Sequence, residues 1–326
     1  MPMKTSIKTL VAGAALAALS FAGAASAAWP ERPVTIIVPA GAGGGTDGTA
    51  RLLAKQLQDE LKQPFNVVNN GQGGGIVGHT QIATARPDGY TLGIVYNYFQ
   101  WKMMGQADIN HTMFTPIAMY NVDPAALLVN VNSPFKTGKE ALDAIKADPG
   151  KYKIGCGGAC GGSWHIPNAE IFIKYGIDPA KPVMVPSAGG ALTSQDLASG
   201  GLDLAVGSLP EGKPLIEAGK LRALYVISPS RQGAPFQDVP TAKEAVGIDM
   251  EGGAFRMVAG PKGLPADIAR ILETTLEKIW KSQEFQDGMK QRNFGTKWLN
   301  SKDTVAFMQQ HEKSLSETMK ALGLAK

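Results

Sequence analysis

A glycine-rich turn between a predicted strand and a predicted helix constrains this chain most. Residues 34–38 form a β-branched run typical of a buried strand, and Pro39 with the glycines of 41–45 ends it. Thr46 and Asp47 are good N-caps for the helix that follows. That helix has one apolar face, formed by Ala50, Leu53, Ala54, Leu57 and Leu61. Because such a turn leaves backbone N–H groups unpaired at the positive end of a helix dipole, it predicts an anion-binding site.

A second glycine cluster, residues 71–78, follows a predicted strand at 65–68 and repeats the arrangement. Two such turns in one half of the chain indicate one ligand held between them. Two alternatives stay open here, since either turn alone can be structural and residues 43–48 fit the G-x-G-x-x-G dinucleotide fingerprint. That fingerprint needs an acidic residue at the end of the second strand, where Asn69 and Asn70 stand in this chain. A nicotinamide cofactor is therefore not expected.

The N-terminal segment has the parts of a secretory signal peptide. Lys4 and Lys8 precede an apolar run over residues 10–22, and Ala25-Ser26-Ala27 supplies an A-x-A cleavage site, so residues 1–27 are predicted to be removed. A retained N-terminal anchor is the alternative, although the apolar run is short for a membrane span. The mature protein is expected to be exported. Removing the two lysines lowers the formal net charge from +4 to +2, which leaves no basic field for nucleic acid.

The length of the chain predicts two domains, because about 300 mature residues exceed what one core usually supports. Strands and helices alternate in the first half, and a second α/β unit begins near residue 152. Two later helices, predicted at 266–281 and 302–322, lack strands of their own and are expected to pack on the first sheet. The first domain is thus predicted to be discontinuous, with residues 28–127 and 253–326, and the second domain to cover 128–252.

Neither nucleophilic catalysis nor a metal site is well supported by the sequence. Residues 161–165, Gly-Gly-Ser-Trp-His, fail the G-x-S-x-G elbow at its last position. The four histidines are scattered, and His79 and His311 are predicted to lie on helix surfaces. A zinc site could use three ligands, Cys156, Cys160 and His165, but no fourth ligand is evident nearby. We therefore expect neither a metal nor another cofactor.

Cys156 and Cys160 are predicted to form a disulfide. They are the only cysteines, and an exported protein meets an oxidising compartment. The intervening Gly157-Gly158-Ala159 can turn tightly enough to bring the two Cα atoms within the ~4.4–6.8 Å that a bridge needs. Two free thiols packed against the following helix are the alternative.

Arg256 is the one basic residue in the otherwise apolar strand predicted over 254–259. A buried arginine is costly without an anionic partner. Its partner is either a protein carboxylate in an ordinary salt bridge or an anionic ligand, and the sequence leaves both possibilities open.

A set of ordered motifs gives the whole mature chain a family resemblance. The motifs are Trp29-Pro30-Glu31-Arg32-Pro33-Val34, Gly43-Gly44-Gly45-Thr46-Asp47 with Ala50-Arg51, Asn69 with Gly73-Gly74-Gly75 and Gly78, Pro87-Asp88-Gly89-Tyr90-Thr91-Leu92, Asp238-Val239-Pro240-Thr241, and Ala259-Gly260-Pro261 with Leu264-Pro265. In these the chain resembles the receptors of tripartite tricarboxylate transporters, the Bug proteins. The resemblance implies an α/β fold of the two-lobed periplasmic binding protein or Venus-flytrap type, with two doubly wound sheets joined by two crossing segments.

The resemblance also implies a function. A periplasmic receptor of this kind would capture a small organic carboxylate, such as a dicarboxylate, an aromatic acid or an amino acid, and deliver it to membrane permease subunits. It would work as a monomer, bind no nucleic acid and catalyse no reaction. Two other readings stay open, namely an exported hydrolase or lyase that uses His165 and Asp203, and a ligand sensor for a membrane kinase.

The ligand site that the resemblance implies lies in loops of both lobes. Residues 44–47 and 73–76 would grip a carboxylate, partly through water, and the opposing lobe would contribute Ser163 and its neighbours, residues 187–191, and Asp203. The predicted ligand-binding residues are Gly44, Gly45, Thr46, Asp47, Gly73, Gly74, Gly75, Ile76, Tyr96, Asn97, Phe99, Gly162, Ser163, Trp164, His165, Ser187, Gly189, Gly190, Ala191, Asp203, Phe255 and Arg256.

The chain departs from the family pattern in three places. These are the cysteine-containing loop 156–165, the aromatic cluster 96–101 and the segment 252–256. Ligand specificity is expected to lie in these segments.

Overall fold

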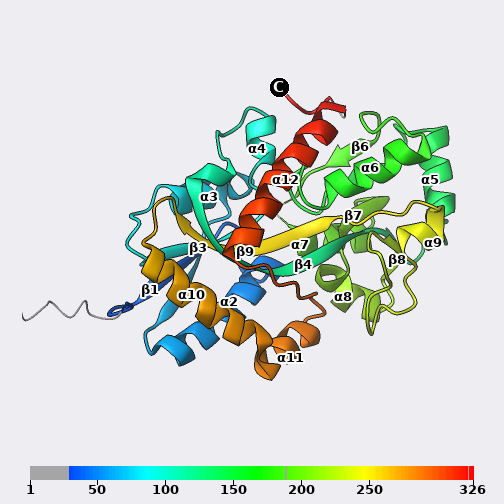
Figure 1. Ribbon diagram of the computed structural model, residues 1–326. Helices are drawn as coiled ribbons and strands as arrows, with labels where there is room; N and C mark the ends of the chain where they lie inside the picture. The colour runs from blue at the N-terminus through cyan, green and yellow to red at the C-terminus, as the bar shows by residue number, and fades with distance from the viewer. Residues whose placement is uncertain (1–28, 188, 322) are drawn as a thin grey trace, which may run out of the picture.

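One long strand, β4 (Phe114–Asn130), belongs to two β-sheets and joins them (Figure 1). In the first sheet it pairs antiparallel with β9 (Gly253–Pro261) as far as the pairing of Pro124 with Gly253. From Ala125 onward it pairs with β7 (Leu204–Ser208) and β8 (Leu221–Val226) in the second sheet. The structure is a computed structural model that describes residues 29–187, 189–321 and 323–326. The predicted signal peptide, 1–27, lies outside the described residues.

The first sheet has the strand order β2-β1-β3-β9-β4, where β1 is Val34–Val38, β2 is Phe65–Asn69 and β3 is Thr91–Val95. The strands β1, β2 and β3 are parallel, and their crossovers are α2 (Gly45–Leu61) and α3 (Ile76–Ala83), the latter preceded by η2 (Gln72–Gly75). On one face lie α2, α10 (Ala266–Lys281) and α11 (Gln283–Gln291). On the other lie α3, α4 (Gln100–Met103), η3 (His111–Met113) and α12 (Ser301–Ala321).

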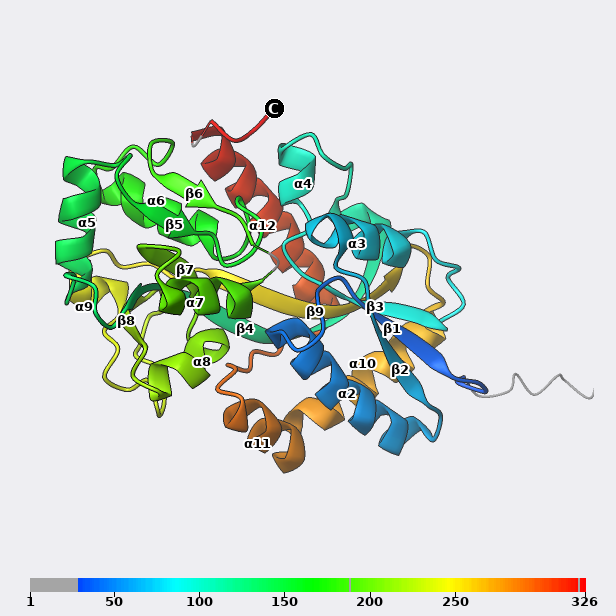
Figure 2. The same cartoon turned by 180° about the vertical axis from the view of Figure 1, so that it is seen from behind.

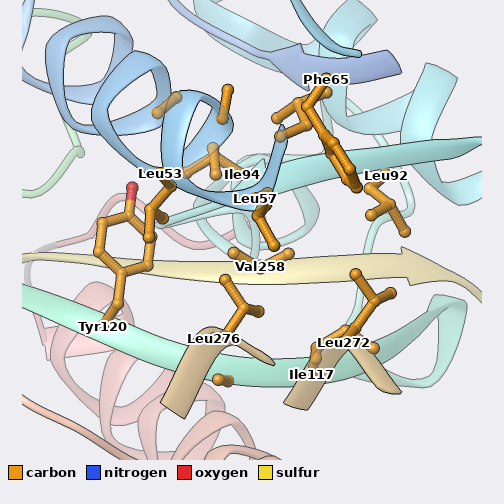
Figure 3. Packing of buried hydrophobic residues seen from close by; sticks show 14 of the residues in the cluster. Leu53, Leu57, Phe65, Leu92, Ile94, Ile117, Tyr120, Val258, Leu272 and Leu276 are labelled. Carbon is orange, nitrogen blue, oxygen red and sulfur yellow. The ribbon is translucent and has the colours of Figure 1, made fainter. Parts of the chain in front are cut away.

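The apolar stripes of α2 and α10 build one core of this sheet. Figure 3 shows Leu53 and Leu57 of α2 and Leu272 and Leu276 of α10 pointing toward Val258 on β9. All of these side chains are at most 1% exposed, so the 3.6-residue period of each helix buries one face completely. Burial of this apolar surface is the main favourable term in the folding of the lobe.

The second sheet has the order β8-β4-β7-β5-β6, where β5 is Lys153–Gly155 and β6 is Val183–Val185. Its helices are α5 (Gly138–Ala147), α6 (His165–Tyr175), α7 (Gly190–Ser199), α8 (Leu209–Glu217) and α9 (Ala242–Val246). Separate apolar clusters cover its two faces. A capping box of Thr137 with Glu140 begins α5, and Gly176, with φ of 82°, ends α6.

The two sheets form two lobes that lie side by side, and β4 and β9 cross between them (Figures 1 and 2). At the crossing, Ala125 N donates a hydrogen bond of 2.8 Å to Gly252 O. The helix α12 packs on β4 and contacts both α4 of the first lobe and α6 of the second. This arrangement confirms the predicted two-lobed fold with two crossing segments. None of the helices in the described ranges has the length and apolarity of a membrane span.

Some elements were not predicted from the sequence. The helices α4, α8, α9 and α11 were missed. The helix α8 contains Pro210 in its first turn and Pro214 in its interior, and both residues favour an interpretation as a loop. Ser208 accepts a hydrogen bond from Glu211 N and thereby begins this helix at a position where Pro210 is tolerated.

A hydrogen bond under α6 gives the first prediction. The hydroxyl of the fully buried Tyr225 donates to Asn168 Oδ1 over 2.9 Å, and Asn168 Nδ2 donates to Trp164 O over 2.9 Å, which fixes the start of α6 on β8. Tyr225→Phe leaves the amide oxygen buried without its donor, so we expect the free energy of unfolding to fall by about 1–3 kcal/mol. Urea denaturation measures this.

The matched control is Tyr175→Phe. Tyr175 hydroxyl donates to Asp143 at the surface, where water replaces the lost group, so a change within about 0.5 kcal/mol is expected. Equal losses in the two variants would contradict the role assigned to Tyr225.

Candidate functional site

A cavity of about 270 Å³ lies between the two lobes. Its walls are the loops that follow the carboxyl ends of β1, β2 and β3 in one lobe and of β5 and β6 in the other, which is where open α/β sheets bind ligands. The first lobe contributes Pro39, Ala40, Gly41, Thr46, Gly71, Gly74, Tyr96, Asn97 and Gln100. The second lobe contributes Gly157, Gly158, Ala159, Gly162, Ser163, Trp164, Ser187, Gly189, Gly190 and Glu211, and the crossing strand β9 contributes Ala254 and Arg256.

The two glycine-rich turns of the first lobe lie against each other. A Cβ on Gly71 would stand 3.0 Å from the backbone of Ala40, and one on Gly75 would stand 2.7 Å from Pro39 O. Gly73, Gly74 and Gly75 have φ of 60°, 68° and 108°, a region that favours glycine. Glycine therefore lets the second turn approach the first so closely that both border one cavity.

His79 holds these two turns together. Its Nδ1 lies 2.9 Å from Gly75 O, its Nε2 accepts a hydrogen bond of 3.3 Å from Tyr96 N, and the Tyr96 hydroxyl donates to Pro39 O. Burial lowers the pKa of His79 from 6.5 to about 4, so the ring is neutral at pH 7. The prediction of a surface position for His79 is wrong, because the rings of Tyr96 and Trp101 pack against it and bury it.

The loop between β5 and α6 is closed by the predicted disulfide. Cys156 and Cys160 are bonded, with their Cα atoms 5.2 Å apart, which confirms the pairing over the free-thiol and zinc alternatives. Cys156 N donates to Val185 O over 2.8 Å, and Ser187 N donates to Gly158 O over 3.0 Å. The bridged loop is thus fixed to the loop after β6, and together they form the second-lobe wall of the cavity.

The buried Arg256 contacts three polar side chains of the protein. Its Nε donates to Thr46 Oγ1 over 3.0 Å, its Nη1 donates to Asn121 Oδ1, and Nη1 lies 3.8 Å from Asp123 Oδ2. The guanidinium lies 5.1 Å from the centre of the Phe294 ring. Arg256 therefore has a protein carboxylate nearby and also lines the cavity. Burial raises the pKa of Asp123 to about 7, although the Arg256 charge opposes this rise.

Glu211 is a cavity residue that the sequence interpretation missed. It lies at the start of α8, and its Oε1 accepts a hydrogen bond of 3.3 Å from Gly45 N at the beginning of α2 in the other lobe. Figure 2 shows the beginning of α2 facing α7 and α8 across the middle of the molecule. Burial raises the pKa of Glu211, and Arg256 and the Gly45 N–H oppose the rise. The spacing of Ser208 and Glu211 is that of a capping box, which is the signal that predicts a helix start here.

Several predicted site residues lie away from the cavity wall. Asp47 accepts hydrogen bonds from Gly43 N and Asn69 and pairs with Arg51, so it stabilises the first turn of α2. Asp203 accepts from Lys153 N over 2.8 Å and borders a separate groove of the second lobe. The remaining residues outside the wall are Gly44, Gly45, Gly73, Gly75, Ile76, Phe99, His165, Ala191 and Phe255.

The contacts of three of these residues explain why they lie outside the cavity wall. Phe99 is 8% exposed and packs in the core with Tyr98 and Trp101, so Tyr96 is the one aromatic side chain of the cluster on the described wall, beside Asn97 and Gln100. His165 is buried and its Nδ1 accepts a hydrogen bond of 2.8 Å from Gly161 N. Gly45 lies just beneath the wall, where a Cβ would stand 2.7 Å from Phe294.

A second cavity, of about 300 Å³, adjoins the first and shares Asn97, Ser163 and Ala254 with it. Phe255 and His311 border it, and their rings are 4.7 Å apart in an edge-to-face contact. The Nε2 atom of His311 is buried, and burial lowers the pKa of His311 to about 4. His311 is only partly exposed, because α12 packs this residue against Phe255 of β9.

Two α/β lobes that are joined by two strands and enclose a small cavity between their loops define a two-lobed solute-binding protein. The chain belongs to the tripartite tricarboxylate transporter family receptors, since the model of that family, TctC, matches residues 49–324. This membership confirms the resemblance found in the sequence motifs.

Individual relatives agree over most of their length. A UPF0065 protein in the gbd 5′ region of Cupriavidus necator is 30% identical over 327 residues, covering 96% of this chain and 95% of the relative. The solved TctC solute binding protein from Polaromonas is 32% identical, with a TM-score of 0.69 over 90% of this chain and 99% of the other. R. palustris Rpa4515, solved with adipate, is 27% identical, with a TM-score of 0.81 over 91% and 99%. The family is one of transporter receptors, and the Polaromonas neighbour is a solute binding protein.

The burial of His79 gives the second prediction. The unfolded chain takes up a proton near the ordinary pKa of 6.5, whereas folded His79 stays neutral down to about pH 4, so the free energy of unfolding falls as the pH drops between these values. His79→Gln removes this contribution. Between pH 8 and pH 5 we expect the wild type to lose about 2 kcal/mol more than the variant.

Urea denaturation at the two pH values measures the difference, and the data at pH 8 correct for any cost of the substitution itself. His165 and His311 are present in both proteins, so their contributions to the pH dependence of the free energy of unfolding cancel in the comparison. Identical losses in both proteins would mean that His79 is not kept neutral by the fold.

Proposed function

We propose that this protein is a periplasmic receptor that captures a small organic carboxylate and presents it to the membrane subunits of a tripartite tricarboxylate transporter. The observation that carries the proposal is the cavity between the lobes, whose walls are glycine-rich turns from both sides together with Arg256. Backbone N–H groups in such turns bind carboxylates without a side chain in the way. Family membership supports the transport role, and adipate, bound by the R. palustris relative, is a carboxylate of this class.

The geometry suggests how the ligand is held. Gly74 of the first lobe and Ala159 of the second face each other, with 3.6 Å between Ala159 Cβ and the position of a Cβ on Gly74. A ligand enclosed at this point contacts both lobes at once, so its binding energy favours the closed arrangement. Closure also removes water, which strengthens hydrogen bonds and ionic contacts to the carboxylate. The bound acid would then be released to the permease when the lobes open.

An enzymatic function has less support than the capture of a ligand. The residues proposed for a hydrolase or lyase do not share a cavity in the described structure, because Asp203 borders a separate groove and His165 is bonded to Gly161 N away from the wall. A sensor for a membrane kinase would use the same ligand site, and nothing in the cavity favours it over a transport receptor.

Native mass spectrometry of protein purified without dialysis tests the proposal. We expect a 1:1 adduct whose mass matches an organic acid, and recovery of the unchanged acid after denaturation. A panel of acids that neither binds to the protein nor raises its melting temperature would contradict the proposed function. Conversion of a bound acid into a product would show an enzyme instead.

Gly74→Val gives the third prediction. A valine side chain there extends toward Ala159, so it fills the space between the lobes, and its Cβ shields the neighbouring N–H groups. We expect the affinity for the captured acid to fall at least tenfold, or about 1.4 kcal/mol, in calorimetry.

Gly263→Val is the matched control, because Gly263 also has positive φ, of 84°, with open space around it and a place outside both cavities. Its backbone cost is similar and its affinity should stay unchanged. Unchanged affinity in Gly74→Val would show that this turn does not hold the ligand. Gly45→Val is a poorer probe, since its Cβ would collide with Phe294 and Arg256.

A further inference from the structure

The carboxylate of Glu211 occupies one of the two anion-binding turns that the sequence assigns to the ligand. Glu211 has the spacing from Ser208 at which a glutamate usually bonds back to the backbone of its own N-cap. Its Oε1 instead accepts the hydrogen bond from Gly45 N across the cleft. The N-terminus of α2 therefore binds an anion that the protein itself supplies.

The surrounding backbone is shaped for this carboxylate. A Cβ on Gly190, the first residue of α7, would stand 2.1 Å from Glu211 Oε2, so glycine is required where the carboxylate meets this helix. The positive ends of two long helices, α2 and α7, thus lie beside one carboxylate. The two helix dipoles act with Arg256 and the Gly45 N–H to oppose the rise in the pKa of Glu211 that burial causes.

One oxygen of Glu211 has no donor in the described part of the protein. Glu211 lines the cavity, and its Oε2 atom is buried and has no hydrogen-bond partner among the residues that the structure describes. A carboxylate only accepts hydrogen bonds, and a buried acceptor without a donor is costly. Two further cavity acceptors, Asn97 Oδ1 and Gln100 Oε1, also lack donors within the described part of the chain. A ligand that brings hydrogen-bond donors would satisfy these acceptors.

The charges of the site limit the ligand further. Among the residues that the structure describes, Glu211 and Arg256 are the charged side chains that line the cavity, and Asp123 lies 3.8 Å behind Arg256. An ionised Glu211 cancels the charge of Arg256, and Asp123, whose pKa burial raises to about 7, adds up to one further negative charge. A dicarboxylate raises this negative charge by two, whereas a zwitterion leaves it unchanged. In a buried site such a difference in charge strongly affects affinity.

We propose that Glu211 selects ligands that carry a primary ammonium group together with a carboxylate, so that this receptor binds amino acids in preference to acids that lack the amine. The ammonium donates to Glu211 Oε2 and to the free amide oxygens of Asn97 and Gln100. The ligand carboxylate lies toward the turns of Gly74 and Gly158, which face the same cavity. This inference rests on the proposed function, since it names the ligand class of the same cavity.

Pairs of acids that differ only by an α-ammonium group test the proposal. The probes are alanine with propionate, aspartate with succinate, glutamate with glutarate, and phenylalanine with 3-phenylpropionate, measured by calorimetry on the full mature protein. For the pair that fits the cavity best, we expect the amino acid to bind at least tenfold more tightly than its partner, since a hydrogen bond to a charged group is worth about this much or more.

Glu211→Gln then removes the negative charge and nearly preserves the shape. We expect the preference for the amino acid to fall at least tenfold in this variant, mainly through weaker binding of the amino acid. Glu217→Gln is the matched control, because Glu217 lies on the same helix with half of its side chain exposed and outside the cavity. It should keep the wild-type preference.

Failure of this inference can be distinguished from failure of the proposed function. If wild-type protein binds propionate, succinate, glutarate or 3-phenylpropionate as tightly as the matching amino acid, the role of Glu211 is overturned and the proposed function stands. A preference that persists in Glu211→Gln overturns it as well. If no member of any pair binds at millimolar concentration, both this inference and the proposed function are contradicted. If Glu211→Gln does not fold, the comparison of each amino acid with its matched acid in the wild-type protein still tests the proposal.

Discussion

The buried guanidinium of Arg256 is the group on which the arrangement of the cavity depends. It lies on the crossing strand β9 and bonds to Asn121 on β4 and to Thr46 in the first turn of α2. An unpaired charge at this depth costs several kcal/mol, so these contacts must be kept for the fold to be stable. They tie the first anion-binding turn to the strands that join the lobes. Asp123 and Glu211 then experience the same positive charge, which opposes the rise in their pKa values that burial causes.

Glycine residues, side-chain hydrogen bonds and the disulfide place backbone groups around the charge of Arg256. Gly71 and Gly75 allow the two turns of the first lobe to touch, His79 and Tyr96 link them by hydrogen bonds, and the disulfide of Cys156 with Cys160 fixes the facing loop. The wall is thus made largely of backbone that is already oriented before a ligand arrives. Preorganised donors lose little entropy on binding, which favours high affinity for a small ligand. Specificity is left to the few side chains that reach the cavity, Glu211 and Arg256 among them.

The sequence predicted those parts of the fold whose structure is determined locally. The stripe of Ile268, Leu272, Leu276 and Ile279 is buried as the helical period requires, and β1 is the predicted strand. The site was harder to predict because it is formed by contacts between distant segments. Glu211 bonds to Gly45, 166 residues away, and its helix is hidden by two prolines. A capping-box spacing predicts a helix start there, but it predicts that the carboxylate turns back to its own helix, not that it crosses to the other lobe.

The most direct test of the account is a crystal structure of the mature protein with the acid that binds it most tightly. The account predicts closed lobes with one ligand in the cavity of about 270 Å³, its carboxylate accepting hydrogen bonds from backbone N–H groups of the glycine turns in both lobes. A ligand bound instead in the adjoining cavity beside His311, or in the groove beside Asp203, with the cavity between the glycine turns empty, would contradict it.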